Sequence, residues 1–214
     1  MVRALLAGTK TQTRRTLNPQ PTECPKGLVS YHGRHGGIHG TVDHAEFRDA
    51  LVDFAARYAA GDRLWVREAW RTQIGDDSWS PAGLGPLVTS WRYEADGKRS
   101  HDDVERFGRF RASMHMPRWV SRLTLIVTAV KVERLQDISE ADAVAEGIRP
   151  FGASGSYISP KHPDGKWRAG HNAYEMYRDL WNAINGAGSW DANPFVAAYT
   201  FTVHHQNVDQ MEAA

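Results

Sequence analysis

Hydrophobic residues recur along this chain with two different periods, which predict where its helices and strands lie. Apolar positions three and four residues apart predict helices over 1–7, 43–58, 139–147 and 174–184. Runs rich in β-branched and aromatic residues predict strands over 61–70, 87–95, 122–135 and 195–203. Strands interrupted by helices, without a regular strand–helix–strand rhythm, indicate an α+β fold with a small, mostly antiparallel, barrel-like sheet and flanking helices.

Capping residues mark the ends of several predicted helices. Gly8 is placed to end the first helix in the left-handed conformation, and the Thr-rich segment 9–16 that follows is expected to be extended. The sequence Asp-His-Ala-Glu at 43–46 resembles a capping box. Ser139 is the expected N-cap of the helix that ends near Gly147.

Glycine and proline gather between these elements and predict long loops over 18–40, 71–86 and 149–172. The chain has no internal repeat and no linker that divides it. We therefore expect a single domain over 1–214, with long loop insertions at about 18–60, 71–116 and 149–172.

Composition and charge narrow the possible functions. The chain has 41% hydrophobic and 24% charged residues, which is typical of a globular protein. Its 26 basic and 25 acidic side chains give a net charge of +1, so any basic site for nucleic acid must be local. No apolar run is long enough to span a membrane or to form a signal peptide, and Cys24 is the only cysteine. A cytoplasmic location is the expectation.

Neither a metal site nor a cofactor is predicted. The histidines of the Gly-rich segment have no cysteine or carboxylate at ligand spacing, which favours solvated loop histidines at positions 32, 35, 39 and 44. The sequence Gly-Thr-Lys-Thr at 8–11 lacks the second glycine of a phosphate-binding loop. Cys24, between Glu23 and Pro25, has no neighbour that would activate a thiol.

One carboxylate stands out in the predicted strand 61–70. Alternation places Glu68 on the same face as Val66 and Trp70. A carboxylate on an apolar face destabilises the fold unless it pairs with a cation or takes part in a functional site. Glu68 therefore either pairs with an arginine or lines a pocket. The tryptophans at 65, 70, 119 and 181 are expected in the core, whereas those at 79 and 167, in loops, are better placed to cover a nucleobase.

Four blocks of the sequence together resemble the ASCH domain family, particularly its bacterial and phage members. The blocks are "AGTKTQTRR" within 2–16, "GDRLWVREAW" at 61–70, "RLTLIVTAVKVERLQDISEADAVAEGI" within 117–148, and "LWNAIN" with the last strand within 173–203. That family has a PUA-like fold, a small β-barrel with flanking helices. Small bacterial members that are similar in these blocks hydrolyse N4-acetylcytidine to cytidine and acetate.

The resemblance implies that Lys10, Thr13 and Glu146 are the catalytic residues, with Glu133 and Glu140 as nearby alternatives for the glutamate. The candidates for binding the substrate, a small modified nucleoside, are Arg15, Arg67, Glu68 and Trp70.

The chemistry of amide hydrolysis fits this residue set. The reaction needs a nucleophile, a base and an acid that protonates the departing nitrogen. Threonine needs a neutral amine beside it, and burial or the neighbouring cations Arg14 and Arg15 favour a neutral lysine. Positions 10 and 13 of a regular strand point to opposite faces, so Lys10 must lie in a turn or bulge just after Gly8. A lysine there is expected to contribute little to the core.

The alternative function is an RNA-binding PUA-like module, possibly with ribonuclease activity. The near-zero net charge weakens this alternative, because phosphate neutralisation supplies most non-specific affinity. A local cluster of arginines would restore it: Arg14, Arg15, Arg67 and Arg71. No membrane partner is expected, and the sequence predicts no oligomeric state.

Overall fold

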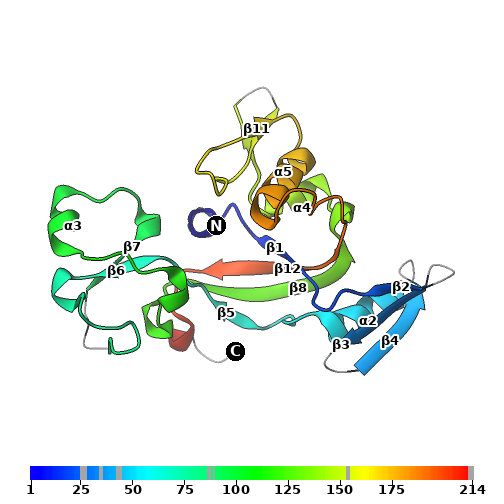
Figure 1. Ribbon diagram of the computed structural model, residues 1–214, viewed down its shortest axis with the longest axis horizontal. Coiled ribbons are helices and arrows are strands. Elements are labelled where there is room, and N and C mark those ends of the chain that lie inside the picture. The colour runs from blue at the N-terminus through cyan, green and yellow to red at the C-terminus, as the bar shows by residue number, and fades with distance from the viewer. Residues whose placement is uncertain are drawn as a thin grey trace. The chain divides into compact units, whose positions relative to one another are not determined.

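The computed structural model describes residues 1–24, 28–33, 36–41, 45–85, 88, 90–152 and 155–211 (Figure 1). The chain forms two compact units. The first comprises Met1 with residues 3–62 and 127–202, and the second comprises Val2 with residues 63–126 and those from 203 onward. The strands β8 (Thr124–Arg134) and β12 (Phe195–His204) continue from one unit into the other, and a single domain over 1–214 stays a prediction.

A four-stranded sheet has the order β1-β12-β8-β5. Its edge strands are β1 (Gln12–Thr16), which pairs antiparallel with β12, and β5 (Arg63–Trp65), which pairs antiparallel with β8. The sheet is a curled half-barrel, open at both edge strands. The predicted α+β class with mostly antiparallel sheets is confirmed, as are the strands predicted at 122–135 and 195–203.

Helices of the first unit cover the β1 end of this sheet. α1 (Val2–Leu6), α4 (Glu140–Ala145) and α5 (Ala173–Asn185) lie beside β1 and β12 in Figure 1. Ser139 caps α4 as predicted, because its side chain accepts a hydrogen bond from the Asp142 N–H. Apolar residues of α4, α5 and β12 form the core of this unit, among them Ala143, Tyr177, Leu180, Trp181 and Val196.

The loop predicted over 18–40 is wrong, because three strands form an antiparallel sheet there. They are β2 (Thr22–Cys24), β3 (Leu28–Gly33) and β4 (Gly36–Thr41), followed by α2 (Ala45–Ala55). Gly36, with a φ of +112°, marks the turn between β3 and β4, but Gly40 makes room for a ring: a Cβ there would lie 2.3 Å from the ring of Phe47. Two residues of the expected capping box, Asp43 and His44, lie outside the described residues.

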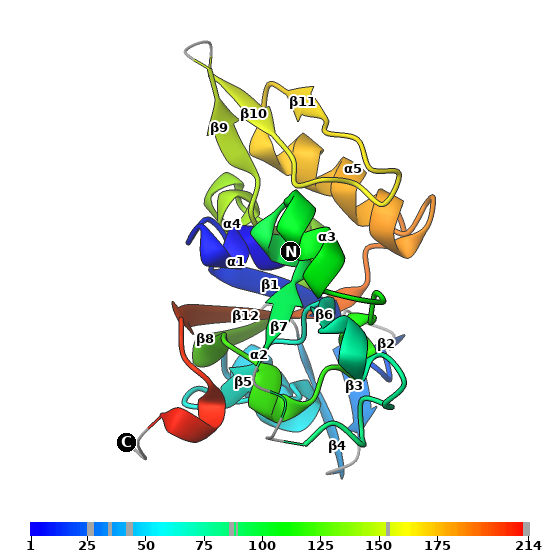
Figure 2. The same ribbon diagram turned by 90° about the vertical axis from the view of Figure 1, so that its left-hand side faces the viewer.

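The loop predicted over 149–172 is also wrong. It contains a second three-stranded antiparallel sheet, of β9 (Arg149–Phe151), β10 (Ser156–Ile158) and β11 (Ala169–Gly170), which lies next to α5 (Figure 2). A Cβ at Gly170 would lie 2.5 Å from the terminal methyl of Met176 on α5. Strands of two or three residues are too short to produce a recognisable period.

The second unit shows where the predicted strand 61–70 fails. β5 ends at Trp65, and extended pairing resumes only in β6 (Trp70–Thr72), which pairs with β7 (Trp91–Tyr93). The Val66 N–H still donates to the Leu123 carbonyl, but the Glu68 N–H donates to the sulfur of Met116 rather than to a neighbouring strand. Of the strand predicted over 87–95, only β7 is observed, and Leu87 and Thr89 lie outside the described residues.

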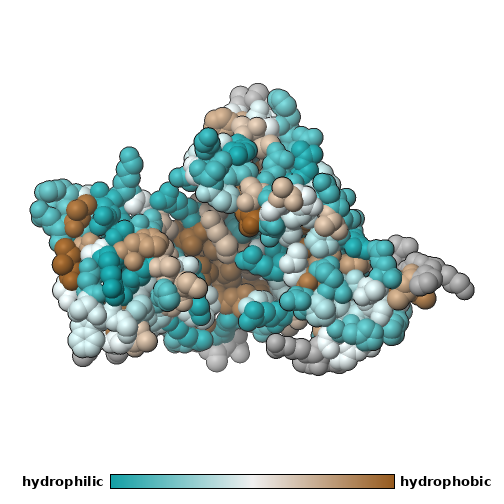
Figure 3. All heavy atoms as spheres, viewed as in Figure 1, coloured by the Kyte–Doolittle hydropathy of each residue, from teal (hydrophilic) through white to brown (hydrophobic). Residues whose placement is uncertain are grey.

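α3 (His101–Arg106) begins at a capping box between Ser100 and Asp103. Short 3-10 turns occur at Ile74–Asp76, Glu94–Asp96, Ser113–His115, Arg118–Val120, Leu135–Asp137 and Val208–Gln210. The surface of the part that carries α3 shows several hydrophobic groups (Figure 3). The apolar side chains that are at least half exposed in the second unit are Ile74, Trp79, Val104, Phe110 and Met114.

Within the described part of the chain, every helix is too short or too polar to span a bilayer.

Candidate functional site

Lys10 lies in the short segment between α1 and β1, where the chain turns. Gly8 has a φ of +65°, which confirms its predicted left-handed conformation. The Thr9 N–H then bonds back to the Ala4 carbonyl at 2.9 Å. Lys10 therefore precedes the regular strand, as the proposed chemistry requires. It is also buried, with 7% of its surface exposed.

Lys10 forms a buried ion pair with Glu146, 136 positions further along the chain. Its ammonium nitrogen lies 2.6 Å from Glu146 Oε2 and donates a second hydrogen bond to the Glu146 carbonyl at 2.9 Å. Glu146 is the C-cap residue of α4 and is 5% exposed. The Thr11 N–H donates to the Ala145 carbonyl at 2.8 Å, which fixes the start of β1 against this helix end. Two of the three predicted catalytic residues therefore meet directly.

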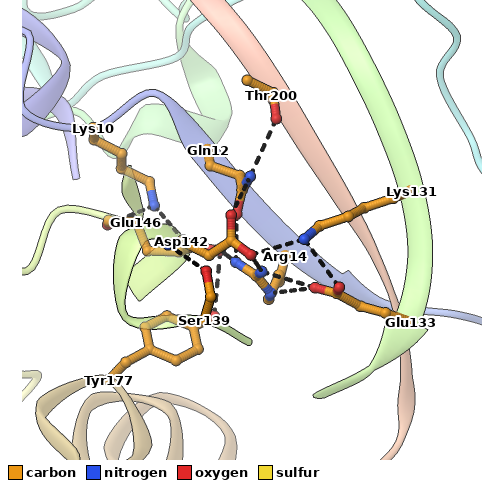
Figure 4. A network of polar contacts seen from close by, with 10 residues as sticks. All are labelled: Lys10, Gln12, Arg14, Lys131, Glu133, Ser139, Asp142, Glu146, Tyr177 and Thr200. Carbon is orange, nitrogen blue, oxygen red and sulfur yellow. Dashed lines mark hydrogen bonds and ion pairs between the residues drawn. The ribbon is translucent and has the colours of Figure 1, made fainter. Parts of the chain in front are cut away.

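The pair belongs to a larger ion cluster centred on Arg14 (Figure 4). The Arg14 side chain is fully buried and contacts three carboxylates, those of Glu133 at 2.7 Å, Asp142 at 3.0 Å and Glu146 at 3.4 Å. The ion cluster comprises three cations and three carboxylates: Lys10, Arg14, Lys131, Glu133, Asp142 and Glu146. Lys131 is nearly half exposed, and the balanced charges allow the other members to be largely buried.

Gln12 holds Arg14 in place. Its side-chain oxygen accepts a hydrogen bond from Arg14 Nη1 at 2.6 Å, and its side-chain nitrogen donates to Asp142 and to Thr200 at 3.1 Å each. The sequence analysis missed Gln12 and Asp142 as site residues. The available signal was the alternation of long polar side chains at 12 and 14, which places both on one face of a strand.

Tyr177 on α5 contacts the other oxygen of Glu146. Its hydroxyl donates a hydrogen bond to Oε1 at 3.3 Å. Burial raises the pKa of Tyr177 far above its ordinary value, and the neighbouring Glu146 charge raises it further. The phenol therefore stays neutral at physiological pH and remains a hydrogen-bond donor to the carboxylate.

A cavity of about 220 Å³ opens beside the Lys10–Glu146 pair, and we name it the lysine cavity. Its polar lining residues include Lys10, Thr13, Arg14, Arg15, Glu146, Lys161 and Tyr177. Trp181 also lines it, and the buried indole N–H of Trp181 has no hydrogen-bond partner among the described residues. A buried donor without a partner is rare in folded proteins.

Thr13 reaches this cavity from the other face of β1. The register pairs Thr13 with Tyr199 and Gln12 with Thr200, so the Thr13 side chain points away from the face that carries Gln12 and Arg14. Thr13 is partly buried, and no hydrogen bond joins it to Lys10 in the described part of the chain. Because β1 is an edge strand, a cavity can extend around its free edge to both faces.

Three of the four predicted substrate-binding residues lie elsewhere. Arg15 is exposed and lines the lysine cavity, but Arg67, Glu68 and Trp70 belong to the second unit and line no cavity described here. Glu68 is paired, with Arg122 donating at 2.9 and 3.0 Å. Arg67 is exposed beside Trp65, whose ring centroid lies 4.7 Å from the guanidinium carbon.

Trp70, and most of the arginines that were expected to bind RNA, are already buried or paired within the protein. Trp70 is fully buried among the apolar residues of the second unit, so it has no free face for stacking. Arg14 is enclosed by carboxylates, and Arg71 pairs with Glu94 at 2.5 Å. Arg15 is therefore the member of that predicted cluster that is exposed and lines a cavity.

Within the described residues, no group of three or more histidines, cysteines or acidic residues is arranged to hold a metal ion. His32 and His39 contact each other edge-on at 5.3 Å, and His32 also contacts Ser30 at 3.0 Å. His35 and His44 lie outside the described residues.

The ion cluster makes stability sensitive to acid. Burial opposes ionisation of Asp142, but Lys131, Arg14 and Gln12 outweigh it and lower the Asp142 pKa from 3.8 to about 2. The stabilisation is therefore present above the ordinary pKa and is lost as the pH falls through about 2. We expect the wild type to lose about 2 kcal/mol from this group between pH 4 and 2.

Denaturant unfolding at a series of pH values measures this loss. Asp142→Asn should already be less stable at neutral pH and should show a shallower decline in acid. Asp53→Asn, an exposed position on α2, is the control. Identical acid dependence in Asp142→Asn and the wild type would contradict the role given to this carboxylate.

The site thus brings together a buried amine–carboxylate pair, a threonine and a tryptophan around one cavity. These groups suit acid–base chemistry on a small polar ligand. When the chain is compared with known proteins, no family model, no curated protein and no solved structure matches it.

Proposed function

We propose that this protein is an amidohydrolase that removes the acyl group from N4-acylated cytosine nucleosides, with N4-acetylcytidine as the reference substrate. The observation that carries the proposal is the 2.6 Å contact between Lys10 and Glu146 in the wall of a cavity that Thr13 also lines. These are the three residues that the resemblance to the ASCH family implies. Membership of that family and a PUA-like version of the fold are part of the same proposal.

The Lys10–Glu146 pair supplies both a base and an acid. Transfer of one proton along the short contact converts the ion pair into a neutral amine and a carboxylic acid. The amine then accepts the Thr13 hydroxyl proton as the threonine oxygen bonds to the acyl carbon. The carbon–N4 bond breaks as Glu146 gives its proton to N4, which releases cytidine. The Lys10 ammonium then returns its proton to Glu146, and the neutral amine takes a proton from water as the water oxygen bonds to the ester carbon. The bond between that carbon and the Thr13 oxygen breaks as Glu146 protonates the threonine oxygen, which releases acetic acid, ionised to acetate at neutral pH.

Two further features support a small planar amide as the ligand. Trp181 lines the cavity and its buried N–H has no partner among the described residues, so a small movement of the ring would let it donate a hydrogen bond to a carbonyl oxygen of the ligand. The volume of about 220 Å³ lies below the range of about 300–1,000 Å³ that is usual for drug-sized ligands. A nucleobase with a short acyl group fits that scale.

Replacing the nucleophile tests the proposal. Thr13→Val keeps the shape of the side chain and removes the hydroxyl, so hydrolysis of N4-acetylcytidine should fall on the order of 10³-fold or more. Thr13→Ser should retain measurable activity because it keeps a hydroxyl. The assay follows the loss of N4-acetylcytidine absorbance with purified protein and verifies release of cytidine and acetate.

Thr11→Val is the matched control, since Thr11 is exposed and does not line the cavity. It should hydrolyse the substrate at the wild-type rate. Full activity in Thr13→Val would show that water, rather than threonine, attacks the acyl carbon. No hydrolysis by the wild type would overturn the proposed function.

A further inference from the structure

A second and larger cavity, of about 640 Å³, lies in the first unit and has a different chemistry from the lysine cavity. We name it the tyrosine–arginine cavity. It is lined by residues 15–19 and 54–58 together with Tyr31, Ala197 and Tyr199. Three tyrosines and two arginines are among these residues, and no aspartate or glutamate is. Its volume lies within the range of about 300–1,000 Å³ that is usual for ligand sites.

The aromatic part of this cavity is preorganised. The rings of Tyr58 and Tyr199 meet edge-on with centroids 5.6 Å apart. The Tyr199 hydroxyl accepts a hydrogen bond from the Arg57 N–H at 3.0 Å, which holds the ring in place. Tyr31 is almost completely buried against the same cavity. Tyr199 is almost completely buried as well, so the partly exposed Tyr58 is the ring that offers a surface to a planar ligand, held in place by its contact with Tyr199.

Among the described residues, no carboxylate neutralises the cationic part of this cavity. Arg15 and Arg57 are exposed, and neither lies within ion-pair distance of a carboxylate in the described part of the chain. Arg57 lies 5.5 Å from the Tyr58 ring centroid, so its charge is held beside an aromatic face. By contrast, Arg14, the residue before Arg15, has three carboxylate partners. An anion bound here would meet two uncompensated positive charges.

We propose that the tyrosine–arginine cavity binds a nucleotide, with its base against Tyr58 and its phosphate at Arg15 and Arg57. A purely apolar ligand would bury the guanidinium groups without a partner, and a simple anion would leave the aromatic surface unused. Arg15 and Thr16 line both cavities, so the nucleotide site adjoins the lysine cavity. The ligand is a free nucleotide or one unit of a single strand. This proposal stands independently of the hydrolase activity.

Direct binding tests this site without any catalytic readout. Isothermal titration calorimetry with cytidine 5′-monophosphate, cytidine and inorganic phosphate compares the whole ligand with its two parts. We expect the monophosphate to bind at least about 10-fold more tightly than either part, with an affinity that falls as salt rises. Arg57→Gln and Tyr58→Leu should each weaken monophosphate binding about 10-fold.

Arg48→Gln is the matched control, because Arg48 is an exposed arginine on α2 that does not line the cavity. Circular dichroism verifies that each variant is folded. Equal affinity for cytidine and its monophosphate, equal affinity for phosphate and the monophosphate, or unchanged binding in both Arg57→Gln and Tyr58→Leu would overturn the proposal.

A short single-stranded RNA distinguishes the two sources of the nucleotide. If the RNA displaces the monophosphate and binds with a steeper salt dependence, the site takes a unit of a strand. If the RNA does not compete, the site takes the free nucleotide. Either result supports a nucleotide site, provided that Arg57→Gln weakens the ligand that binds.

Discussion

Lys10→Arg is expected to lower hydrolysis of N4-acetylcytidine by about 10²–10⁴-fold, the usual contribution of a general base, while the protein stays folded. Arginine keeps the positive charge and can keep the ion pair with Glu146, but its guanidinium does not give up a proton near neutral pH. The substitution therefore separates the role of the charge from the role of the base. Initial rates over a range of substrate concentrations measure the effect.

Lys166→Arg is the control, since Lys166 is exposed and does not line the lysine cavity. Thermal unfolding of both variants checks that the fold is intact. Hydrolysis at the wild-type rate in Lys10→Arg would contradict the assignment of Lys10 as the base.

Lys10→Ala gives less information about catalysis than the sequence suggests, because it also affects stability. A lysine after a helix cap was expected to contribute little to the core, but Lys10 is 7% exposed and is the closest cationic partner of Glu146. Removing it leaves a buried carboxylate with a longer contact to Arg14, so stability falls together with activity.

Arg14→Ala is expected to destabilise the protein by about 3–5 kcal/mol, because it leaves buried carboxylates without their shared partner. The Arg14 side chain is completely enclosed and contacts Glu133, Asp142 and Glu146. Denaturant-induced unfolding measures the loss. Arg14→Lys keeps one charge without the planar fork, so it should lose less stability and remain measurable if the alanine variant does not fold.

Arg118→Ala is the matched control for this experiment. Arg118 pairs with Asp209 at 2.7 Å, but both side chains are more than half exposed. Exposed pairs contribute about 1 kcal/mol or less, so this variant should unfold close to the wild type. If Arg14→Ala and Arg118→Ala lost the same stability, the ion cluster would not be a principal stabilising feature of the first unit.

The sequence predicted the elements whose apolar pattern is long or whose caps are distinctive. The strands at 122–135 and 195–203 and the final helix carry enough β-branched or amphipathic positions to identify them. Gly8 and Ser139 were identified because a left-handed helix end and a side-chain cap each favour a specific residue type.

The sheets at 18–40 and 149–172 were missed because glycine has two uses. In a turn it supplies a positive φ, whereas at Gly40 and Gly170 it allows a large side chain of a neighbouring helix to lie against a strand. Only the positions of Phe47 and Met176 in space distinguish the two uses. A local sequence pattern contains no such information.

The ion cluster was missed for a related reason. From the sequence, Arg14 of "QTRRT" is assigned to the cations beside Lys10 and to a candidate RNA-binding cluster, and no carboxylate partners are predicted for it. Its partners lie 119–132 positions away, on β8 and at α4, so no local pattern indicates them. The pairing of Lys10 with Glu146 was anticipated only through the family resemblance.

The two faces of β1 place a limit on how this chain can diverge. One face carries Gln12 and Arg14 into the ion cluster, and the other carries Thr13 and Arg15 toward the cavities. Inserting or deleting one residue between Gly8 and Gln12 would be tolerated only if the register of β1 on β12 stayed fixed, because a one-residue slip exchanges the faces. The segment between the end of α1 and the start of β1 should therefore vary in sequence but keep its length, unlike the long connections elsewhere in the chain.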